Sequence, residues 1–243
     1  MKNKVKKIAI VAKAETSAAK RIVQQAIKLA KAAGLQPVTD ESTASLAELK
    51  LPIRKDPIAI SRFADLIMVI GGDGTMLHWA RTTAGSGTPI FGVNVGGLGF
   101  LTASSWKDLP KAMNAVVAGK FSIESRTLLS AIGQSCREKF KLKAMNDFVI
   151  SRDSIPRMIS LEVKVDGEVL TTYRCDGLVI STSTGSTAYS LAAGGAIIAP
   201  EAKVISITPI CPHTLSNRAV IINQQSTIEV RMLDTKREAN LSA

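Results

Sequence analysis

Apolar and polar positions follow a repeating order in the first half of the chain. Three short apolar runs, at residues 8–12, 64–70 and 89–93, predict β-strands that are buried on both faces. Segments with a helical period lie between and after them, at residues 15–33, 76–83 and 106–118. Residues 39–62 are polar and interrupted by proline, which favours a loop with short helical pieces.

Strands that alternate with helices predict a parallel sheet with right-handed crossovers, a Rossmann-like α/β architecture. Ligands of such sheets bind beyond the carboxyl ends of the strands. The sequence Gly71-Gly72-Asp73-Gly74-Thr75 follows the apolar run at residues 64–70. We therefore expect these five residues at the ligand-binding edge of the sheet.

The second half of the chain has the pattern of a mostly β domain. Leu161, Val163 and Val165 alternate with polar residues, and the dipeptide Asp166-Gly167 that follows is typical of a tight hairpin turn. Further runs predict short strands at residues 148–150, 169–173, 178–181, 204–209, 219–222 and 227–232. We expect an α/β domain over residues 1–121 and a β-sandwich-like domain over residues 122–243.

Charge narrows the class of protein. The chain has 243 residues, with 31 Lys and Arg against 20 Asp and Glu, and a formal net charge of +11. The excess is concentrated in residues 1–70 and suits a polyanionic partner, but a solvated surface is the plainer explanation. Ten aromatic residues without a stacking pattern argue against a protein that binds single-stranded nucleic acid.

The expected compartment is the cytoplasm. No apolar run is long enough for a transmembrane helix. The apolar run at residues 8–12 is shorter than the core of a secretory signal. Cys136, Cys175 and Cys211 are an odd number of cysteines without CxxC spacing, which favours free thiols in a reducing compartment.

The glycine turn at residues 71–75 carries the strongest chemical signal. Its three glycines let a ligand approach the backbone closely, and successive N–H groups before a helix form a cradle for phosphates. A carboxylate inside such a cradle repels phosphate unless it binds a metal ion or takes a proton from an attacking hydroxyl. The alternative is a strand-to-helix turn in which Asp73 caps the helix.

Several familiar motifs are absent from the sequence. It contains no GxxxxGK[ST], no GxGxxG after a strand, no protein-kinase HRD or DFG, and no GxSxG. His213, in Cys211-Pro212-His213, has no partners at the spacing of metal ligands, so we expect a structural role for it and no metal-ligating residues.

A second dense segment covers residues 173–195. Seven Ser and Thr hydroxyls lie between residues 181 and 190, and they suit hydrogen bonds to ribose, phosphate or amide groups. Asp176 is a candidate for a ribose hydroxyl pair and Arg174 for a phosphate. Asn146-Asp147 is a candidate for a ribose or adenine edge. The alternatives are a solvated loop at residues 181–190 and a simple turn at residues 146–147.

These segments together resemble the NAD kinase family. The resemblance is carried by GGDGT at 71–75, the Asn-acidic pair at 146–147, DGLVISTSTGSTAYSLAAGG at 176–195 and ITPICPHTLSNRAVII at 207–222. GGDGT alone is shared with 6-phosphofructokinases and with diacylglycerol and sphingosine kinases. Its combination with TGSTAYSLAAGG is specific to this family.

The resemblance implies an ATP-dependent phosphotransferase that moves the γ-phosphoryl group of ATP to the 2′-hydroxyl of the adenosine ribose of NAD, producing NADP. It also implies a divalent cation, normally Mg²⁺, and a homodimer or homotetramer. NAD and ATP are the expected partners, with no nucleic acid and no membrane.

The resemblance also assigns roles to residues. Asp73 matches the catalytic base, and Gly71, Gly72, Gly74 and Thr75 match the cradle of the ATP phosphates. The positions that match NAD contacts are Asp73, Gly74, His78, Asn146, Asp147, Arg157, Arg174, Asp176, Thr187, Ala188, Tyr189, Ser190, Leu191 and Ala192. His78 stands where the family often has Arg or Lys, and an ordinary helix-surface position is the alternative.

The sequence departs from the family pattern at three places. Asp147 stands where Glu is more usual, and Ser183 replaces a common Pro, which we expect to loosen the loop slightly. Family members usually continue past the position of Ala243, so we expect a shortened β domain with an unpaired edge strand. The alternatives to an NAD kinase are a GGDGT-type kinase for another acceptor and a non-catalytic module that binds NAD or another nucleotide.

Overall fold

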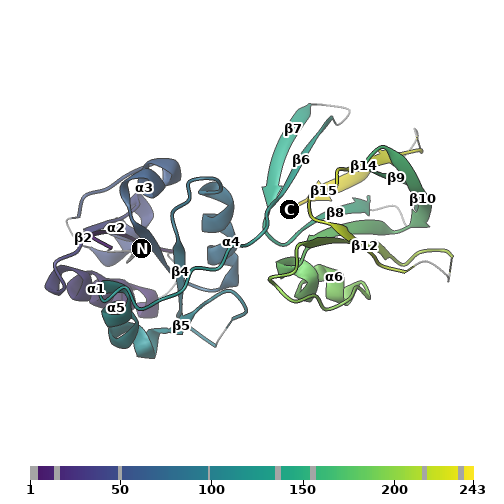
Figure 1. The fold of residues 1–243 in the computed structure, drawn as a ribbon. Coiled ribbons are helices and arrows are strands. Elements are labelled where there is room, and N and C mark those ends of the chain that lie inside the picture. Colours follow the sequence, from purple (N-terminus) through teal and green to yellow (C-terminus); the bar gives the residue numbers. More distant parts are fainter. Residues whose placement is uncertain are drawn as a thin grey trace. The chain divides into compact units, whose positions relative to one another are not determined.

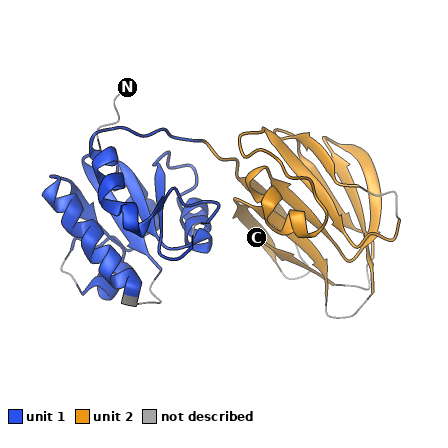
Figure 2. Ribbon diagram, turned by 90° about the horizontal axis from the view of Figure 1, so that it is seen from below, with its two compact units in different colours: residues 1–124 blue, residues 125–243 orange. Residues whose placement is uncertain are grey.

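The computed structural model describes residues 5–13, 17–48, 51–97, 99–134, 138–153, 157–214, 218–234 and 238–243. The chain divides into two compact units, residues 1–124 and 125–243, which are coloured separately in Figure 2. Each unit is built around hydrophobic cores of its own.

Unit 1 contains a parallel sheet with the strand order β2-β1-β3-β4-β5 (Figure 1). Its strands are β1 (Lys7–Ala12), β2 (Gln36–Val38), β3 (Leu66–Ile70), β4 (Ile90–Asn94) and β5 (Ser104–Ser105). β1 lies between β2 and β3, so the strand order reverses there. Such a reversal is where open α/β sheets bind ligands, beyond the carboxyl ends of the strands.

Helices cover both faces of this sheet (Figure 1). α1 (Ser17–Ala32) and α5 (Leu109–Val117) share one core with β1 and β3, and α3 (Pro57–Phe63) and α4 (Asp73–Thr82) share the other. Because both faces are covered, β3 is apolar and buried at every position. The unit also contains α2 (Glu41–Ala47) and the 3₁₀ turn η1 (Trp106–Asp108). No helix in the part of the chain that the structure describes is long and apolar enough to cross a membrane.

Unit 2 is a sandwich of two antiparallel sheets, with strand orders β10-β9-β14 and β13-β12-β11-β8-β15, and a hairpin of β6 and β7. Its strands are β6 (Leu129–Gln134), β7 (Lys139–Ala144), β8 (Asp147–Arg152), β9 (Ile159–Val165), β10 (Glu168–Cys175), β11 (Gly177–Thr182), β12 (Val204–Ile210), β13 (Val220–Asn223), β14 (Ile228–Met232) and β15 (Ala239–Ser242). A short 3₁₀ turn, η2 (Thr184–Thr187), and the single-turn helix α6 (Tyr189–Ala192) follow β11.

The core of unit 2 lies between its two sheets. Leu161 and Tyr173 from the smaller sheet pack with Leu178 and Ile207 from the larger one. The hairpin turn predicted at Asp166-Gly167 is confirmed, since both residues have positive φ, 52° and 89°, as a type I′ turn requires. Along β9, alternate side chains are buried in this core and those between them are partly buried.

The expected fold class is confirmed, and each predicted strand lies within two residues of an observed one. The helix predicted at residues 76–83 begins earlier, at Asp73, because Gly72 is its N-cap. The helix predicted at residues 106–118 is split into η1 and α5. β2, β5, β6, β7 and β15 were not predicted. In β6 a glycine and polar residues interrupt the apolar pattern, whereas β7, with the sequence KFKLKA, alternates lysine with apolar residues and so carried the strand pattern.

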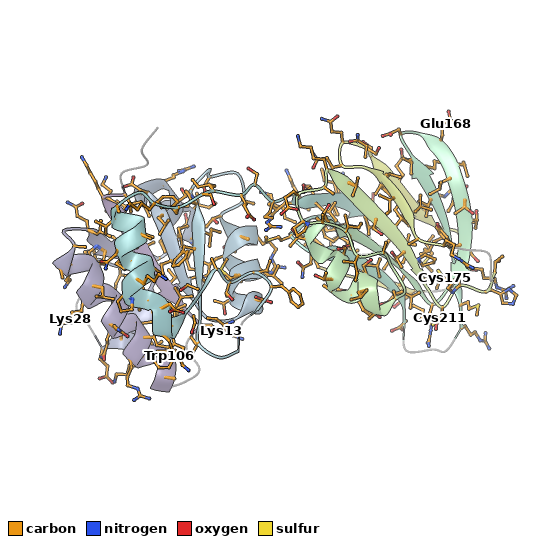
Figure 3. The ribbon with its side chains drawn as sticks, turned by 60° about the horizontal axis from the view of Figure 1, so that its bottom comes forward. Lys13, Lys28, Trp106, Glu168, Cys175 and Cys211 are labelled. Carbon is orange, nitrogen blue, oxygen red and sulfur yellow. The ribbon has the colours of Figure 1, made fainter. Side chains whose placement is uncertain are left out.

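Two cysteines lie in the described residues, and both are free thiols. Cys175 is buried and Cys211 is exposed (Figure 3). Burial raises the pKa of the Cys175 thiol to about 11, so this thiol stays protonated and unreactive near neutral pH. Cys136 lies outside the described residues.

Candidate active site

The glycine turn lies at the carboxyl end of β3, beside the reversal of strand order. The Gly71 N–H donates to the carbonyl of Val93 at 3.0 Å, which ties the turn to the end of β4. Gly72 is the N-cap residue of α4, and no side chain that the structure describes makes a capping hydrogen bond at this helix end. Asp73 is therefore the first residue of the helix, and the interpretation of Asp73 as the helix cap is wrong.

The Asp73 carboxylate is held by backbone N–H groups from a loop 27 residues away. Phe100 N–H donates to Oδ2 at 2.9 Å, and Leu101 N–H donates to Oδ1 at 3.1 Å. Gly99 lies directly against the same carboxylate, because a Cβ built there would be 2.3 Å from Oδ1. One loop thus fixes the direction of the Asp73 side chain and leaves little space around its carboxylate.

That loop, residues 94–102, is shaped by two buried polar side chains. The Asn94 Oδ1 atom accepts the Gly96 N–H at 2.7 Å, and Asn94 Nδ2 donates to Thr102 Oγ1 at 3.2 Å. Gly99 N–H also donates to Thr102 Oγ1, at 3.3 Å. The site assignment from sequence missed this loop. The sequence did carry a signal for this loop, because a glycine-rich stretch follows a buried strand there, as it does at residues 71–75.

Phe100 is a second residue that the sequence assignment missed. Its side chain is 85% exposed although its backbone N–H holds the Asp73 carboxylate. The exposed ring thus belongs to a residue whose backbone is fixed at the carboxylate, and it offers an apolar surface in the same loop. We therefore add Phe100 to the candidate site.

The residues of the glycine turn divide into packing and open positions. A Cβ on Gly71 would lie 2.5 Å from the Oγ1 atom of the buried Thr75 side chain, so glycine is needed there for packing. A Cβ on Gly72 or Gly74 would meet no described atom within 4 Å. The Thr75 N–H donates to the Gly72 carbonyl at 3.0 Å. The two N–H groups before it, those of Asp73 and Gly74, stand where a helix offers no acceptor of its own, so this open side is suited to an anion.

His78 lies on the exposed surface of α4. Its ring stands edge-on to Trp79, with ring centroids 6.2 Å apart. This placement agrees with an ordinary helix-surface residue as well as with a ligand contact, and the NAD contact stays a prediction.

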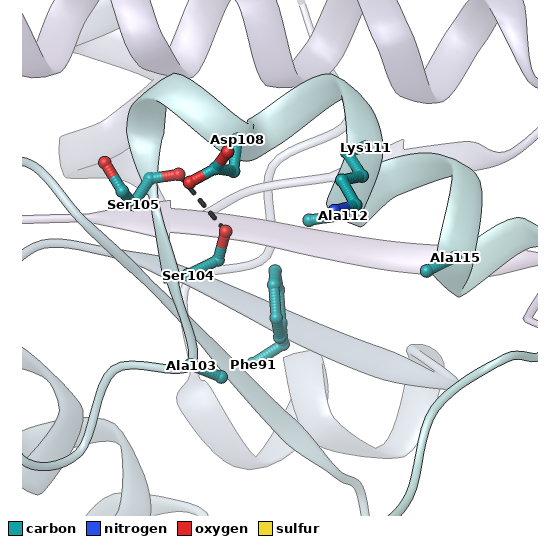
Figure 4. A pocket seen from close by; sticks show the side chains of 8 residues that line it. All are labelled: Phe91, Ala103, Ser104, Ser105, Asp108, Lys111, Ala112 and Ala115. Carbon is teal, nitrogen blue, oxygen red and sulfur yellow. Dashed lines mark hydrogen bonds between the residues drawn. The ribbon is translucent and has the colours of Figure 1, made fainter.

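Unit 1 also has a groove of about 460 Å³ between α5 and the outer strands of the sheet (Figure 4). Phe91, Ser104 and Lys111 are among its lining residues. None of the residues assigned from the sequence lies in this lining, so we do not include the groove in the candidate site.

In unit 2, Asn146 and Asp147 lie where β8 begins, opposite the end of β11. Thr182 joins the two segments: its N–H donates to the carbonyl of Asn146 at 2.8 Å, and its hydroxyl donates to the carbonyl of Met145 at 2.6 Å. The same hydroxyl accepts the Gly185 N–H at 3.0 Å. A Cβ on Gly185 would lie 2.2 Å from the Asn146 carbonyl oxygen, so the loop rests directly on the acidic pair.

The Asp147 carboxylate has one unsatisfied oxygen. Burial raises its pKa, and the nearby backbone of Tyr189 opposes that rise. The Oδ2 atom is buried, and no described group donates a hydrogen bond to it. An unpartnered buried carboxylate oxygen costs stability, so it marks a place where a ligand hydroxyl would supply the missing donor.

The hydroxyl-rich segment serves a different purpose from the one expected. Five of its seven hydroxyl side chains are buried, and they bond to groups of the protein itself. These five are Ser181, Thr182, Ser183, Ser186 and Ser190. The interpretation that these hydroxyls face a ligand is wrong for all five, and the side chain of Ser190 points inward. Thr187, Tyr189, Leu191 and Ala192 keep exposed or partly exposed surface, and Ala188 is partly buried.

Ser183 replaces a proline of the family pattern and gains contacts that proline lacks. Its hydroxyl donates to the carbonyl of Ala202 and, at 3.3 Å, to that of Val204. These bonds tie the end of β11 to the segment before β12. They offset the loosening expected from the loss of proline.

Asp176, which directly precedes β11, lies at the other end of the large sheet from Asp147, and Arg174 lies near the end of β10 in the smaller sheet. Ser181, which pairs with Asp147, lies near the far end of β11 from Asp176. The five residue steps between Asp176 and Ser181, of about 3.4 Å each, place the two ends about 17 Å apart. Asp176 is paired with Arg152, with 2.9 Å between Oδ1 and Nε, a partner that sequence reasoning missed. Arg157 and Arg174 are exposed, and the Arg174 carbonyl accepts the His213 N–H at 2.8 Å. Within one unit the assigned residues thus form two separate groups.

Comparison with known families decides the identity of this arrangement. The model of the ATP-NAD kinase N-terminal domain matches residues 8–121, and that of the ATP-NAD kinase C-terminal domain matches residues 145–242. The chain belongs to the NAD kinase family. The resemblance inferred from the motifs is therefore confirmed.

Individual NAD kinases are similar over most of the chain. The NAD kinase of Geotalea daltonii is 36% identical over 98% of this chain and 84% of its own length. The NAD kinase of Desulforamulus reducens is 49% identical over 70% of this chain and 59% of its own length. This chain therefore spans less than two thirds of the Desulforamulus relative in that match.

Two solved structures of related enzymes share the fold. The yeast NADH kinase complexed with NADH has a TM-score of 0.87 and 28% identity, over 98% of this chain and 75% of that one. An NAD kinase from Archaeoglobus fulgidus in complex with ATP has a TM-score of 0.71 and 25% identity, over 93% of this chain and 80% of that one.

Proposed function

We propose that the chain is an ATP-dependent kinase that transfers the γ-phosphoryl group of ATP to the 2′-hydroxyl of the adenosine ribose of NAD, producing NADP. Membership of the NAD kinase family supports the activity. The related structures named for complexes with NADH and ATP support the acceptor class and the donor. The observation that carries the proposal is the Asp73 carboxylate, fixed by two N–H groups beside the free amino end of α4.

In this reaction Asp73 is the general base. The ribose oxygen forms a bond to the γ-phosphorus while the bond from that phosphorus to the bridging oxygen of ADP breaks. The hydroxyl proton passes to the Asp73 carboxylate, and ADP leaves. Most of the catalysis comes from alignment of the reacting groups, because phosphoryl transfer requires little other chemistry from the protein. The N–H groups at Gly72 and Gly74 bind the phosphate oxygens on the open side of the turn.

The Asp147 group binds the dinucleotide. A carboxylate oxygen without a donor accepts a ribose hydroxyl. Tyr189, whose backbone lowers the pKa of the same carboxyl, has an exposed ring that offers a further contact. The remaining proposed contacts are residues next to Asp147 and Tyr189 in the sequence: Asn146, Thr187, Ala188, Ser190, Leu191 and Ala192. We keep Arg157, Arg174 and Asp176 as NAD contacts proposed from the resemblance alone.

A divalent cation accompanies the nucleotide. No three His, Cys, Asp or Glu side chains come together among the described residues, so the chain offers a metal ion few ligands of its own. This donor set fits Mg²⁺, which proteins hold through one or two carboxylates and the phosphates of the substrate. Asp73 would be the carboxylate, since each oxygen accepts one N–H and keeps further lone pairs. When bound, Mg²⁺ neutralises charge on the phosphates.

The test is NADP formation from NAD, ATP and Mg²⁺, with Asp73→Asn run beside the parent chain. We expect the variant to lose on the order of 10²–10⁴ in kcat, the range for a general base, with NAD affinity largely kept. Loss of NAD affinity with turnover preserved would overturn the assigned role. A parent chain that binds NAD without forming NADP would be a non-catalytic module, and phosphorylation of another acceptor would identify a different GGDGT-type kinase.

The family resemblance also leads us to propose a cytoplasmic homo-oligomer, a dimer or tetramer. Light scattering coupled to size-exclusion chromatography measures the mass of the assembly. A monomer at micromolar concentration would contradict the proposal.

A further inference from the structure

The loop at residues 94–102 is fastened to strand β4 at both of its ends. At its start, Asn94 is the last residue of β4, and its side chain is buried. At its end, Thr102 lies directly against β4, because a Cβ built on Gly92 would be 3.1 Å from the Thr102 Cα atom. The N–H that follows, that of Ala103, donates to the Gly92 carbonyl at 3.1 Å. Both ends of the loop therefore rest on one strand in the middle of unit 1.

The Thr102 hydroxyl joins the ends of the loop to its middle. Its oxygen accepts a hydrogen bond from Asn94 Nδ2 at 3.2 Å and another from the Gly99 N–H at 3.3 Å. A hydroxyl oxygen has two lone pairs, so it can accept both groups at once. Thr102 and Asn94 are both buried, so little water is available to replace this acceptor if it is lost.

The two residues after Gly99 carry the connection to the carboxylate. The N–H groups of Phe100 and Leu101 donate to Asp73 Oδ2 at 2.9 Å and to Asp73 Oδ1 at 3.1 Å. Because each peptide group is a rigid plane, a rotation of the backbone at Gly99 changes the direction of the N–H groups that follow. Hydrogen bonds weaken steeply when their angle is lost, so the orientation of Gly99 decides how firmly the carboxylate is held.

Strand β4 also holds the backbone of Asp73. The carbonyl of Val93, next to Asn94 in β4, accepts the N–H of Gly71 at 3.0 Å, two residues before Asp73. The carboxyl end of β4 thus holds Asp73 from two sides, through the glycine turn and through the loop. Together these bonds form a closed ring, and the Thr102 hydroxyl is the link between β4 and the part of the loop that contacts the carboxylate.

We propose that Thr102 is a positioning residue for the general base: its hydroxyl oxygen closes this ring and so fixes the Phe100 and Leu101 N–H groups that hold the Asp73 carboxylate. Thr102 acts through Gly99 and the two residues that follow it. Its effect on catalysis rests on the proposed function, whereas the link from Thr102 to the two N–H groups is a property of the fold alone.

The test replaces Thr102 by Val, which keeps the volume and branching of the side chain and removes the hydroxyl, and by Ser, which keeps the hydroxyl. Thr39→Val is the matched control, because Thr39 is also buried in unit 1 and its hydroxyl donates to the Ile10 carbonyl at 2.7 Å. NADP formation gives kcat and the KM of each substrate, and NMR gives hydrogen exchange at individual amides without ligand. Circular dichroism checks the fold, and Thr102→Ala takes the place of the Val variant if that variant does not fold.

We expect Thr102→Val to speed exchange at the Phe100 and Leu101 amides and to leave the amides of β3 and β4 protected. Its kcat should fall roughly tenfold, less than the loss of about 10²-fold for a reacting group misplaced by about 1 Å, because the loop keeps its other bonds to β4. The KM values for NAD and ATP should stay near those of the parent chain. Thr102→Ser should restore kcat and exchange, and Thr39→Val should change neither.

A double-mutant cycle with Asp73→Asn separates positioning of the base from a general structural defect. When the base is absent there is nothing to position, so Thr102→Val should lower the residual kcat of Asp73→Asn by about twofold at most. A general defect would instead lower kcat by the same factor with and without the Asp73 carboxylate.

Parental exchange at the Phe100 and Leu101 amides in Thr102→Val would overturn the inference. So would an equal loss of kcat in the two backgrounds of the cycle. If the parent chain forms no NADP, the proposed function fails, but exchange at the two amides still decides whether Thr102 holds them.

Discussion

Replacing Gly99 by Ala tests whether the loop at residues 94–102 positions the catalytic base. The Cβ of alanine would lie 2.3 Å from Asp73 Oδ1, 2.8 Å from Cγ and 2.9 Å from Oδ2. Ordinary contacts of a Cβ atom begin near 3.4 Å. The carboxylate or the loop must therefore move by about 1 Å, and the N–H bonds from Phe100 and Leu101 lengthen or break as it does.

The size of the effect follows from this displacement. Misplacing a reacting group by about 1 Å costs up to about 10²-fold in rate, which is about 2.7 kcal/mol of activation free energy. We expect Gly99→Ala to lower kcat by roughly this factor. The loss should be smaller than or equal to that of Asp73→Asn, because the carboxylate is still present.

Gly97→Ala is the matched control. It lies in the same loop, and a Cβ built there meets no described atom within 4 Å. NADP formation is followed at saturating NAD and ATP for the parent chain and both variants, and circular dichroism checks that each is folded. A folded Gly99→Ala protein with the kcat of Gly97→Ala would refute the argument that this loop holds Asp73 in place.

Two further substitutions test unit 2. Burial raises the pKa of Asp147 above its ordinary 3.8, so the folded state binds this proton more tightly than the unfolded state, and the group costs stability as the pH rises through its folded pKa. Asp147→Asn should therefore be more stable than the parent chain in urea unfolding at pH 7, and this gain in stability should shrink towards pH 3.8. The NAD affinity of the variant should fall. A variant that is less stable than the parent chain at pH 7 would contradict the argument that the buried carboxylate costs stability. Ser183→Ala removes the hydroxyl bonds to Ala202 and Val204 and should lower the free energy of unfolding by about 1 kcal/mol, whereas an unchanged urea midpoint would show that these bonds contribute nothing.

Much of the fold could be predicted because it depends on short-range patterns. A strand buried on both faces is apolar at every position, as in β3, and a hairpin turn needs residues that tolerate positive φ, as at Asp166-Gly167. Two of the strands that escaped prediction did so for different reasons. β2 has three residues, too few to show a period. β7 alternates lysine with apolar residues, so the strand pattern was in the sequence and was overlooked.

The motifs located the two chemical centres but did not show the role of each side chain in them. Gly71 and Gly74 look alike in the sequence, yet Gly71 is required by the packing of Thr75 whereas Gly74 faces open space. The hydroxyls at residues 181–190 look alike too, yet Ser190 bonds inward to Thr208. Local sequence does not distinguish these cases, because the direction of a side chain depends on what lies across from it.

The sequence by itself determined the two architectures, the family and the place of Asp73 at the end of a buried strand. Only the tertiary structure decided what holds the chemical groups in place. The Asp73 carboxylate is held by N–H groups 27 and 28 residues away, and Ser190 is held by a strand residue 18 positions further on. A loop does not hold its two ends at a fixed distance until the strands that it joins are paired. Such partners therefore come together only when the sheets form.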